Sequence, residues 1–182
     1  MIRASPARPT SWTSRSTVTD AHRGSILVIG LGNELRGDDG AGIAVARRLR
    51  DCSRTFGLDV REQRGEPSDL LETWQHADAV VLVDTMHSGA PPGTLRRFDA
   101  SSAPLPAPLH GSSSTHALGL SEAIELGRAL GRLPARVIVY AVEGHMFGAG
   151  QALSPKVETA LAPLAAAVLR QARSLKRASA HA

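Results

Sequence analysis

The chain has 182 residues, 42% of them hydrophobic, which is enough for one compact domain and too little for two. Its single cysteine excludes an intramolecular disulfide and any zinc or iron–sulfur centre built on several cysteines, so we expect a reducing, cytoplasmic setting. No apolar run approaches the roughly 20 residues that cross a bilayer, and no membrane partner is expected.

The net charge of +4 is concentrated near the two ends of the chain. Residues 1–24 carry +3 and residues 165–182 carry +4, which leaves −3 on residues 25–164. A nucleic-acid groove needs positive charge on the folded surface, so nucleic acid is not an expected partner. We expect a disordered extension at 1–24, for which a transit peptide is the alternative, a single α/β domain at 25–169 and a basic tail at 170–182.

The first half of the domain alternates strands with helices. Residues 25–31 are a continuous apolar run ending in a glycine turn, which indicates a buried strand, and we expect it to be central. Apolar residues three and four apart then predict an amphipathic helix from about Asp39. A weaker strand is predicted at 58–62, and a short helix with proline in its first turn at 67–75.

The second half continues the alternation. Residues 78–84 and 136–142 are predicted buried strands, and 93–98 is an expected edge strand because charged residues fill its middle. A loop at 99–114 precedes a helix that ends near Gly131, and Ser154 and Pro155 open the last helix. These elements predict a three-layer α/β fold, with a twisted, mostly parallel sheet of about five strands sandwiched between helices.

Ligands of such sheets bind outside the carboxyl ends of the strands, where the glycine-rich residues 30–42 follow the first strand. A dinucleotide site is disfavoured because Leu35 replaces the third glycine of G-x-G-x-x-G, and because Asp38 and Asp39 would repel a pyrophosphate. One aspartate can cap the helix while the other faces outward. Carboxylates at a helix start can also hold a cation.

Two more candidates lie at the same sheet edge. Asp84 ends a buried strand, and His116 lies at the start of the helix after the long loop. Each taken alone is compatible with a turn or core role, but with Asp39 they form an O,O,N set suited to nickel or zinc. Glu143 and His145 form a fourth candidate group, for which an exposed loop is the favoured interpretation.

Several ordered motifs resemble the endopeptidases that mature nickel–iron hydrogenases. The resemblance runs from Ser25 to Leu169. It rests on the pattern G-x-G-N-x-L-x-x-D-D-G-x-G at 30–42, Val83-Asp84 with Pro92-Gly93-Thr94, H-x-L-G-L at 116–120, A-V-E at 141–143 and L-S-P at 153–155.

The resemblance implies an enzyme that removes the C-terminal peptide of a hydrogenase large-subunit precursor. It further implies that Asp39, Asp84 and His116 contact nickel presented by that substrate rather than permanently bound, in a monomer or weak oligomer. Asp39 or Asp84 would act as the catalytic base on water, which would make it an aspartic-type, metal-dependent protease.

Two rival classes remain for comparison. A strand ending in Gly-Leu-Gly-Asn also opens peptidyl-tRNA hydrolases, but Glu34 and Leu35 stand where Pro-Gly should follow. A nucleotide-binding regulatory module is disfavoured by Leu35 and by the acidic pair at 38–39.

Overall fold

The computed structural model describes residues 25–106 and 115–180, apart from the side chains of Cys52, Arg54 and residues 115–118. The expected extension at 1–24 therefore lies outside the described residues. The elements in chain order are β1 (Ile26–Leu31), the 3-10 turn η1 (Gly37–Gly40), α1 (Ala41–Phe56), β2 (Asp59–Gln63), α2 (Pro67–Trp74), β3 (Ala79–Met86), β4 (Leu95–Asp99), α3 (Thr115–Ala129), β5 (Arg136–Glu143) and α4 (Pro155–Ser179).

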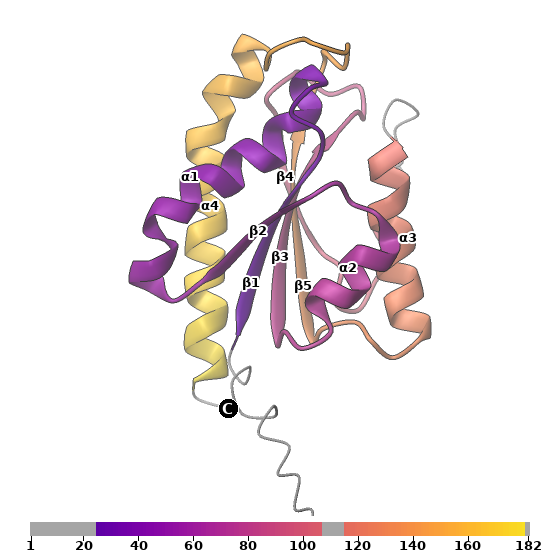
Figure 1. Ribbon diagram of the computed structural model, residues 1–182, viewed down its shortest axis with the longest axis vertical. Coiled ribbons are helices and arrows are strands. Elements are labelled where there is room, and N and C mark those ends of the chain that lie inside the picture. The colour runs from indigo at the N-terminus through magenta and orange to yellow at the C-terminus, as the bar shows by residue number, and fades with distance from the viewer. Residues whose placement is uncertain (1–24, 107–114, 181–182) are drawn as a thin grey trace, which may run out of the picture.

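The sheet lies between two pairs of helices, which confirms the predicted three-layer fold (Figure 1). Helices α1 and α4 cover one face and α2 and α3 cover the other. Successive side chains of a strand point to opposite faces. Val81 and Val83 of β3 accordingly pack in the α1–α4 layer, whereas Val80 and Leu82 pack in the α2–α3 layer.

The strand order is β2-β1-β3-β5-β4, with β4 antiparallel and the other pairs parallel. The prediction of an edge strand at β4 is confirmed. The expectation that β1 is central is wrong, because the chain leaves β1 for β2 on one side and returns to β3 on the other. Strand β3 is therefore the middle strand. This reversal puts a topological switch point between β1 and β3, where the turns after the two strands diverge.

Two glycines bring α1 unusually close to the sheet. A Cβ atom on Gly42 would overlap the carbonyl oxygens of Leu31 and Val83, and one on Gly30 would overlap the carbonyl oxygen of Gly42. The glycines of this segment thus allow backbone to pack on backbone. That contact sets the height of η1 above the strand ends.

The last helix runs beyond Leu169, where the sequence suggested the domain boundary. It continues to Ser179, and Ala172 and Leu175 on this part are buried in the α1–α4 layer. Lys176 donates hydrogen bonds to the carbonyl oxygens of Phe56 and Gly57 at the end of α1 (2.9 and 2.7 Å). The expected basic tail is thus packed helix as far as Ser179. Within the described ranges, no helix combines the length and apolarity needed to cross a bilayer.

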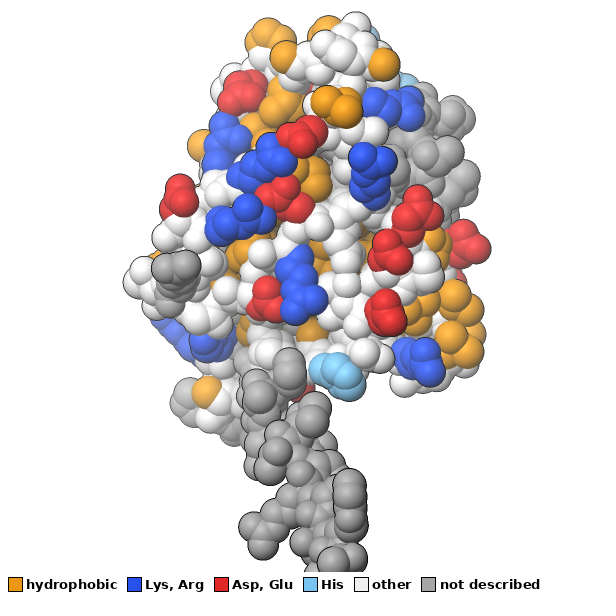
Figure 2. Space-filling model, in the orientation of Figure 1, with side chains coloured by type: hydrophobic (Ala, Val, Ile, Leu, Met, Phe, Trp, Pro, Cys, Tyr) orange, Lys and Arg blue, Asp and Glu red, His pale blue; other side chains and the backbone are white. Residues whose placement is uncertain are grey.

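The face shown in Figure 2 carries cations and anions side by side over α1 and β2. Arg47 pairs with Glu34 and Glu62, and Arg61 pairs with Asp59. Exposed pairs of this kind contribute little stability one by one. They do show that the cations over these two elements are balanced by neighbouring carboxylates.

Candidate active site

The turn after β1 brings two aspartates to the switch point. Gly32 has a φ of 127°, a conformation that side chains rarely adopt, and the chain then folds back so that the Asn33 N–H donates to the Asp39 carbonyl (3.2 Å). The following 3-10 turn carries Asp38 and Asp39, and both are buried. The expectation that one of them faces outward is therefore wrong.

Asp39 and Asp84 lie on neighbouring segments at the carboxyl edge. They are 1% and 3% exposed, respectively. Burial raises the pKa of Asp84 to about 7, and the negative charge of Asp39 adds to the rise, although the Thr85 N–H donates to Asp84 Oδ1 (2.7 Å). The turn and strand are tied together by a hydrogen bond from the Thr85 hydroxyl to the Asp38 carbonyl (2.7 Å). Two buried carboxylates that repel each other in this way favour the binding of a proton or a cation.

His116 is the second residue of α3, and its side chain lies outside the described residues. The start of α3 is at the same end of the molecule as η1 (Figure 1). Gly119 lets α3 pack closely against the segment before α2, because a Cβ atom there would approach the Gly65 carbonyl oxygen to 2.5 Å. Among the described side chains, no group of three His, Cys, Asp or Glu converges as a metal site, and His116 is not among the side chains compared.

Asp38 is a structural carboxylate, a role that the sequence did not reveal. Its Oδ1 accepts a hydrogen bond from Ser154 N–H (2.6 Å), and its Oδ2 accepts from the N–H groups of His145 and Met146 and from the Ser154 hydroxyl (2.8–2.9 Å). Burial alone would raise its pKa, but these donors outweigh burial and hold the pKa below the usual value. Asp38 therefore joins η1 to the segment between β5 and α4.

The favoured interpretation of Glu143 and His145 as an exposed loop is wrong for Glu143. Glu143 is 1% exposed, and its carboxylate accepts hydrogen bonds from the segment Ser88–Gly89, which follows β3. His145 is exposed, although its N–H is bound to Asp38. A carboxylate at the end of a buried strand, as in Asp84, was the signal that could have identified Glu143.

The protein is therefore a doubly wound α/β protein with an acidic site at the switch point between β1 and β3. The family model for hydrogenase maturation proteases matches residues 64–171, which is more than half of the chain. The chain belongs to the hydrogenase maturation protease family. The matched region contains Asp84 and His116 and begins after Asp39.

Individual relatives agree with this assignment. The chain is 28% identical over 142 residues to the hydrogenase expression/formation protein HupD of Thiocapsa roseopersicina, covering 76% of this chain and 63% of HupD. The hydrogenase maturating endopeptidase HybD from E. coli superposes with a TM-score of 0.68 at 25% identity, covering 82% of this chain and 93% of HybD. The HybD maturation protease of Thermococcus kodakarensis shares the fold, with a TM-score of 0.64 at 24% identity over 81% of this chain and 99% of that one. These matches favour the maturation protease over both rival classes.

Proposed function

We propose that the protein is an endopeptidase that removes the C-terminal peptide of a nickel–iron hydrogenase large-subunit precursor after nickel has been inserted. The family match over residues 64–171 carries the proposal. The buried carboxylates at the switch point support it, because they supply acidic chemistry where this fold binds ligands. In this proposal the enzyme acts in the cytoplasm, as a monomer or weak oligomer, without nucleic acid or membrane.

We assign the contact with nickel to Asp39, Asp84 and His116, with the metal carried by the precursor. Two carboxylates and an imidazole suit a borderline divalent cation and leave coordination positions for groups of the substrate. The raised pKa of Asp84 supports this assignment, because a cation would relieve the cost of burying its charge beside Asp39. Nickel is thus part of the substrate rather than a cofactor of the enzyme, and its presence marks a precursor that is ready for cleavage.

We assign the role of general base to Asp39 or Asp84. Whichever of the two carboxylates nickel leaves free can accept a proton from water. The bound cation or His116 would stabilise the oxyanion that forms on the peptide carbonyl as the water adds. Both aspartates belong to segments fixed by hydrogen bonds, so little rearrangement is needed when the substrate binds.

The test compares nickel-loaded with nickel-free precursor, with the products weighed by mass spectrometry. We expect cleavage of the loaded precursor alone, and we expect Asp84→Asn and His116→Ala to abolish it. Asp59→Asn is a matched control and should leave cleavage unchanged. Asp59 is an exposed aspartate at the amino end of β2, away from the sheet edge that carries the site. Equal cleavage of both precursors, or of neither, would count against the proposal.

A further inference from the structure

Glu143 is a buried carboxylate that the proposed chemistry does not use. Its Oε1 accepts hydrogen bonds from the N–H groups of Ser88 (2.7 Å) and Gly89 (2.9 Å), and its Oε2 accepts one from the Ser88 hydroxyl (2.8 Å). Its own backbone bonds to Gly93 and Thr94 at the far end of the same loop (2.8 Å each). One residue therefore holds both ends of the connection between β3 and β4.

The start of this loop has little packing of its own. Residues 88–93 are Ser, Gly, Ala, Pro, Pro and Gly, and a Cβ atom added to Gly89 would meet nothing within 4 Å. A buried carboxylate is costly unless hydrogen-bond donors surround it, and here the loop donates three hydrogen bonds to Glu143. Hydrogen bonds to the Glu143 carboxylate thus hold the start of the loop, at Ser88 and Gly89.

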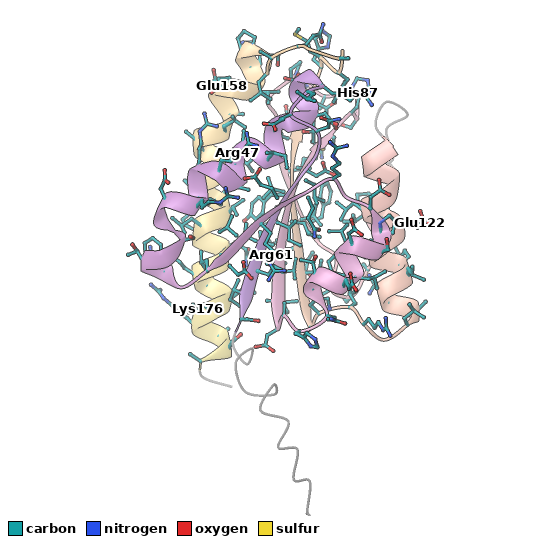
Figure 3. The ribbon with its side chains drawn as sticks, viewed as in Figure 1. Arg47, Arg61, His87, Glu122, Glu158 and Lys176 are labelled. Atoms are coloured by element: carbon teal, nitrogen blue, oxygen red, sulfur yellow. The ribbon has the colours of Figure 1, made fainter. Side chains whose placement is uncertain are left out.

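The loop begins with His87, the residue that follows the strand carrying Asp84. The His87 ring meets the Phe147 ring edge-on, with centroids 5.7 Å apart and planes at 82°, and His87 Nδ1 lies 3.5 Å from the Gly144 carbonyl oxygen. His87 is exposed and Phe147 is half-buried. Figure 3 shows His87 at the end of the molecule where η1 and the β5–α4 segment lie.

We propose that Glu143 is a positioning residue for substrate recognition, which holds His87 against Phe147 so that the two rings form a fixed wall beside the cleavage site. The inference rests on the proposed function. The wall formed by the two rings contacts the segment of the precursor next to the cleaved bond. The phenyl ring offers an apolar surface, and the imidazole offers a hydrogen-bonding nitrogen to the backbone of an extended peptide.

Two substitutions separate positioning from direct chemistry. In Glu143→Gln the amide oxygen can accept from both backbone N–H groups and the amide nitrogen can donate to the Ser88 hydroxyl, so the wall survives although acid–base chemistry is lost. Glu143→Ala leaves all three donors without their acceptor. We expect the glutamine variant to cleave as the wild type does. We expect the alanine variant to raise KM about tenfold with little change in kcat, a size that corresponds to one or two lost hydrogen bonds.

Glu122→Ala is the matched control, because Glu122 is an exposed glutamate on α3 (Figure 3), and it should leave both constants unchanged. A second measurement follows the wall without any substrate. The His87 ring protons should show a ring-current shift in NMR spectra, assigned by its loss in Phe147→Leu. That shift should persist in Glu143→Gln and collapse in Glu143→Ala.

The outcomes are distinguishable. An unchanged His87 signal and KM in Glu143→Ala would overturn the proposal, as would loss of cleavage in Glu143→Gln with the His87 signal intact, which would mark Glu143 as a catalytic group. A His87 signal that responds as expected, in a protein whose wild type cleaves no precursor, would refute the proposed function and with it the recognition role. Glu143 would then be a positioning residue for His87 alone.

Discussion

Replacing Asp84 with asparagine should stabilise the protein at alkaline pH and have much less effect at acidic pH. The carboxylate is buried next to Asp39, which raises its pKa to about 7. In the unfolded chain the pKa returns to about 3.9. Asparagine has no charge to bury, and its side-chain oxygen can still accept the Thr85 N–H.

The sign follows from proton binding. The folded wild type holds the Asp84 proton more tightly than the unfolded chain does. Protonation of Asp84 therefore contributes its full stabilisation of the wild type below about pH 4, and this contribution is lost as the pH rises through about 7. Roughly three pKa units at 1.36 kcal/mol each amount to about 4 kcal/mol lost by the wild type above pH 7. At pH 5 the wild type has lost less than half of this amount, because most of the shift lies above that pH.

Urea unfolding of both proteins at pH 5 and pH 8 measures this difference. Relative to the wild type, Asp84→Asn should gain about 2 to 3 kcal/mol between the two conditions, while the other titrating groups cancel in the comparison. Asp39→Asn should shift the Asp84 transition to lower pH, because it removes a neighbouring negative charge. The same stability difference between Asp84→Asn and wild type at both pH values would refute the reasoning.

Three further substitutions test the frame of the site. Asp38→Ala should lower the free energy of unfolding by about 3 kcal/mol, because it removes the acceptor of one buried and two part-buried N–H groups. Urea unfolding checks this, and a loss below about 1 kcal/mol would contradict it. Gly42→Ala should destabilise the protein by about 2 kcal/mol, although alanine has the better helix propensity, because the methyl group would meet two carbonyl oxygens. A raised Tm would contradict this prediction and show that α1 can move away from the sheet. Arg128→Ala should cost about 1 to 2 kcal/mol in thermal unfolding, since its guanidinium donates to the Ala100 and Ser101 carbonyls, and an unchanged Tm would contradict that role.

The layers and strands could be predicted from the sequence because buried parallel strands read as unbroken apolar runs. Residues 25–31, 78–84 and 136–142 all lie within or next to observed strands. Strand order could not be predicted, because each of these runs is equally apolar. The reversal that puts β3 in the middle depends on which side of β1 each helix crosses.

The site was only partly visible in the sequence. Residue type and position pointed to Asp84, which ends an apolar run, and to Asp39, which stands at the start of a predicted helix. The difference between Asp38 and Asp39 was hidden, since the partners of Asp38 are more than 100 residues away along the chain. The same distance problem concealed the partners of Glu143, which are Ser88 and Gly89.

The last helix has a consequence for how the two ends of the molecule depend on each other. At its start, Ser154 binds the carboxylate of Asp38, the neighbour of Asp39. At its far end, Lys176 holds the last carbonyls of α1, the helix whose other end continues from η1 (Figure 3). Helices α1 and α4 are thus joined at both ends, through Asp38 at the site and through Lys176 at the opposite end of the molecule. Loss of the Lys176 contacts would therefore weaken the same pair of helices that holds Asp38 in place beside Asp39.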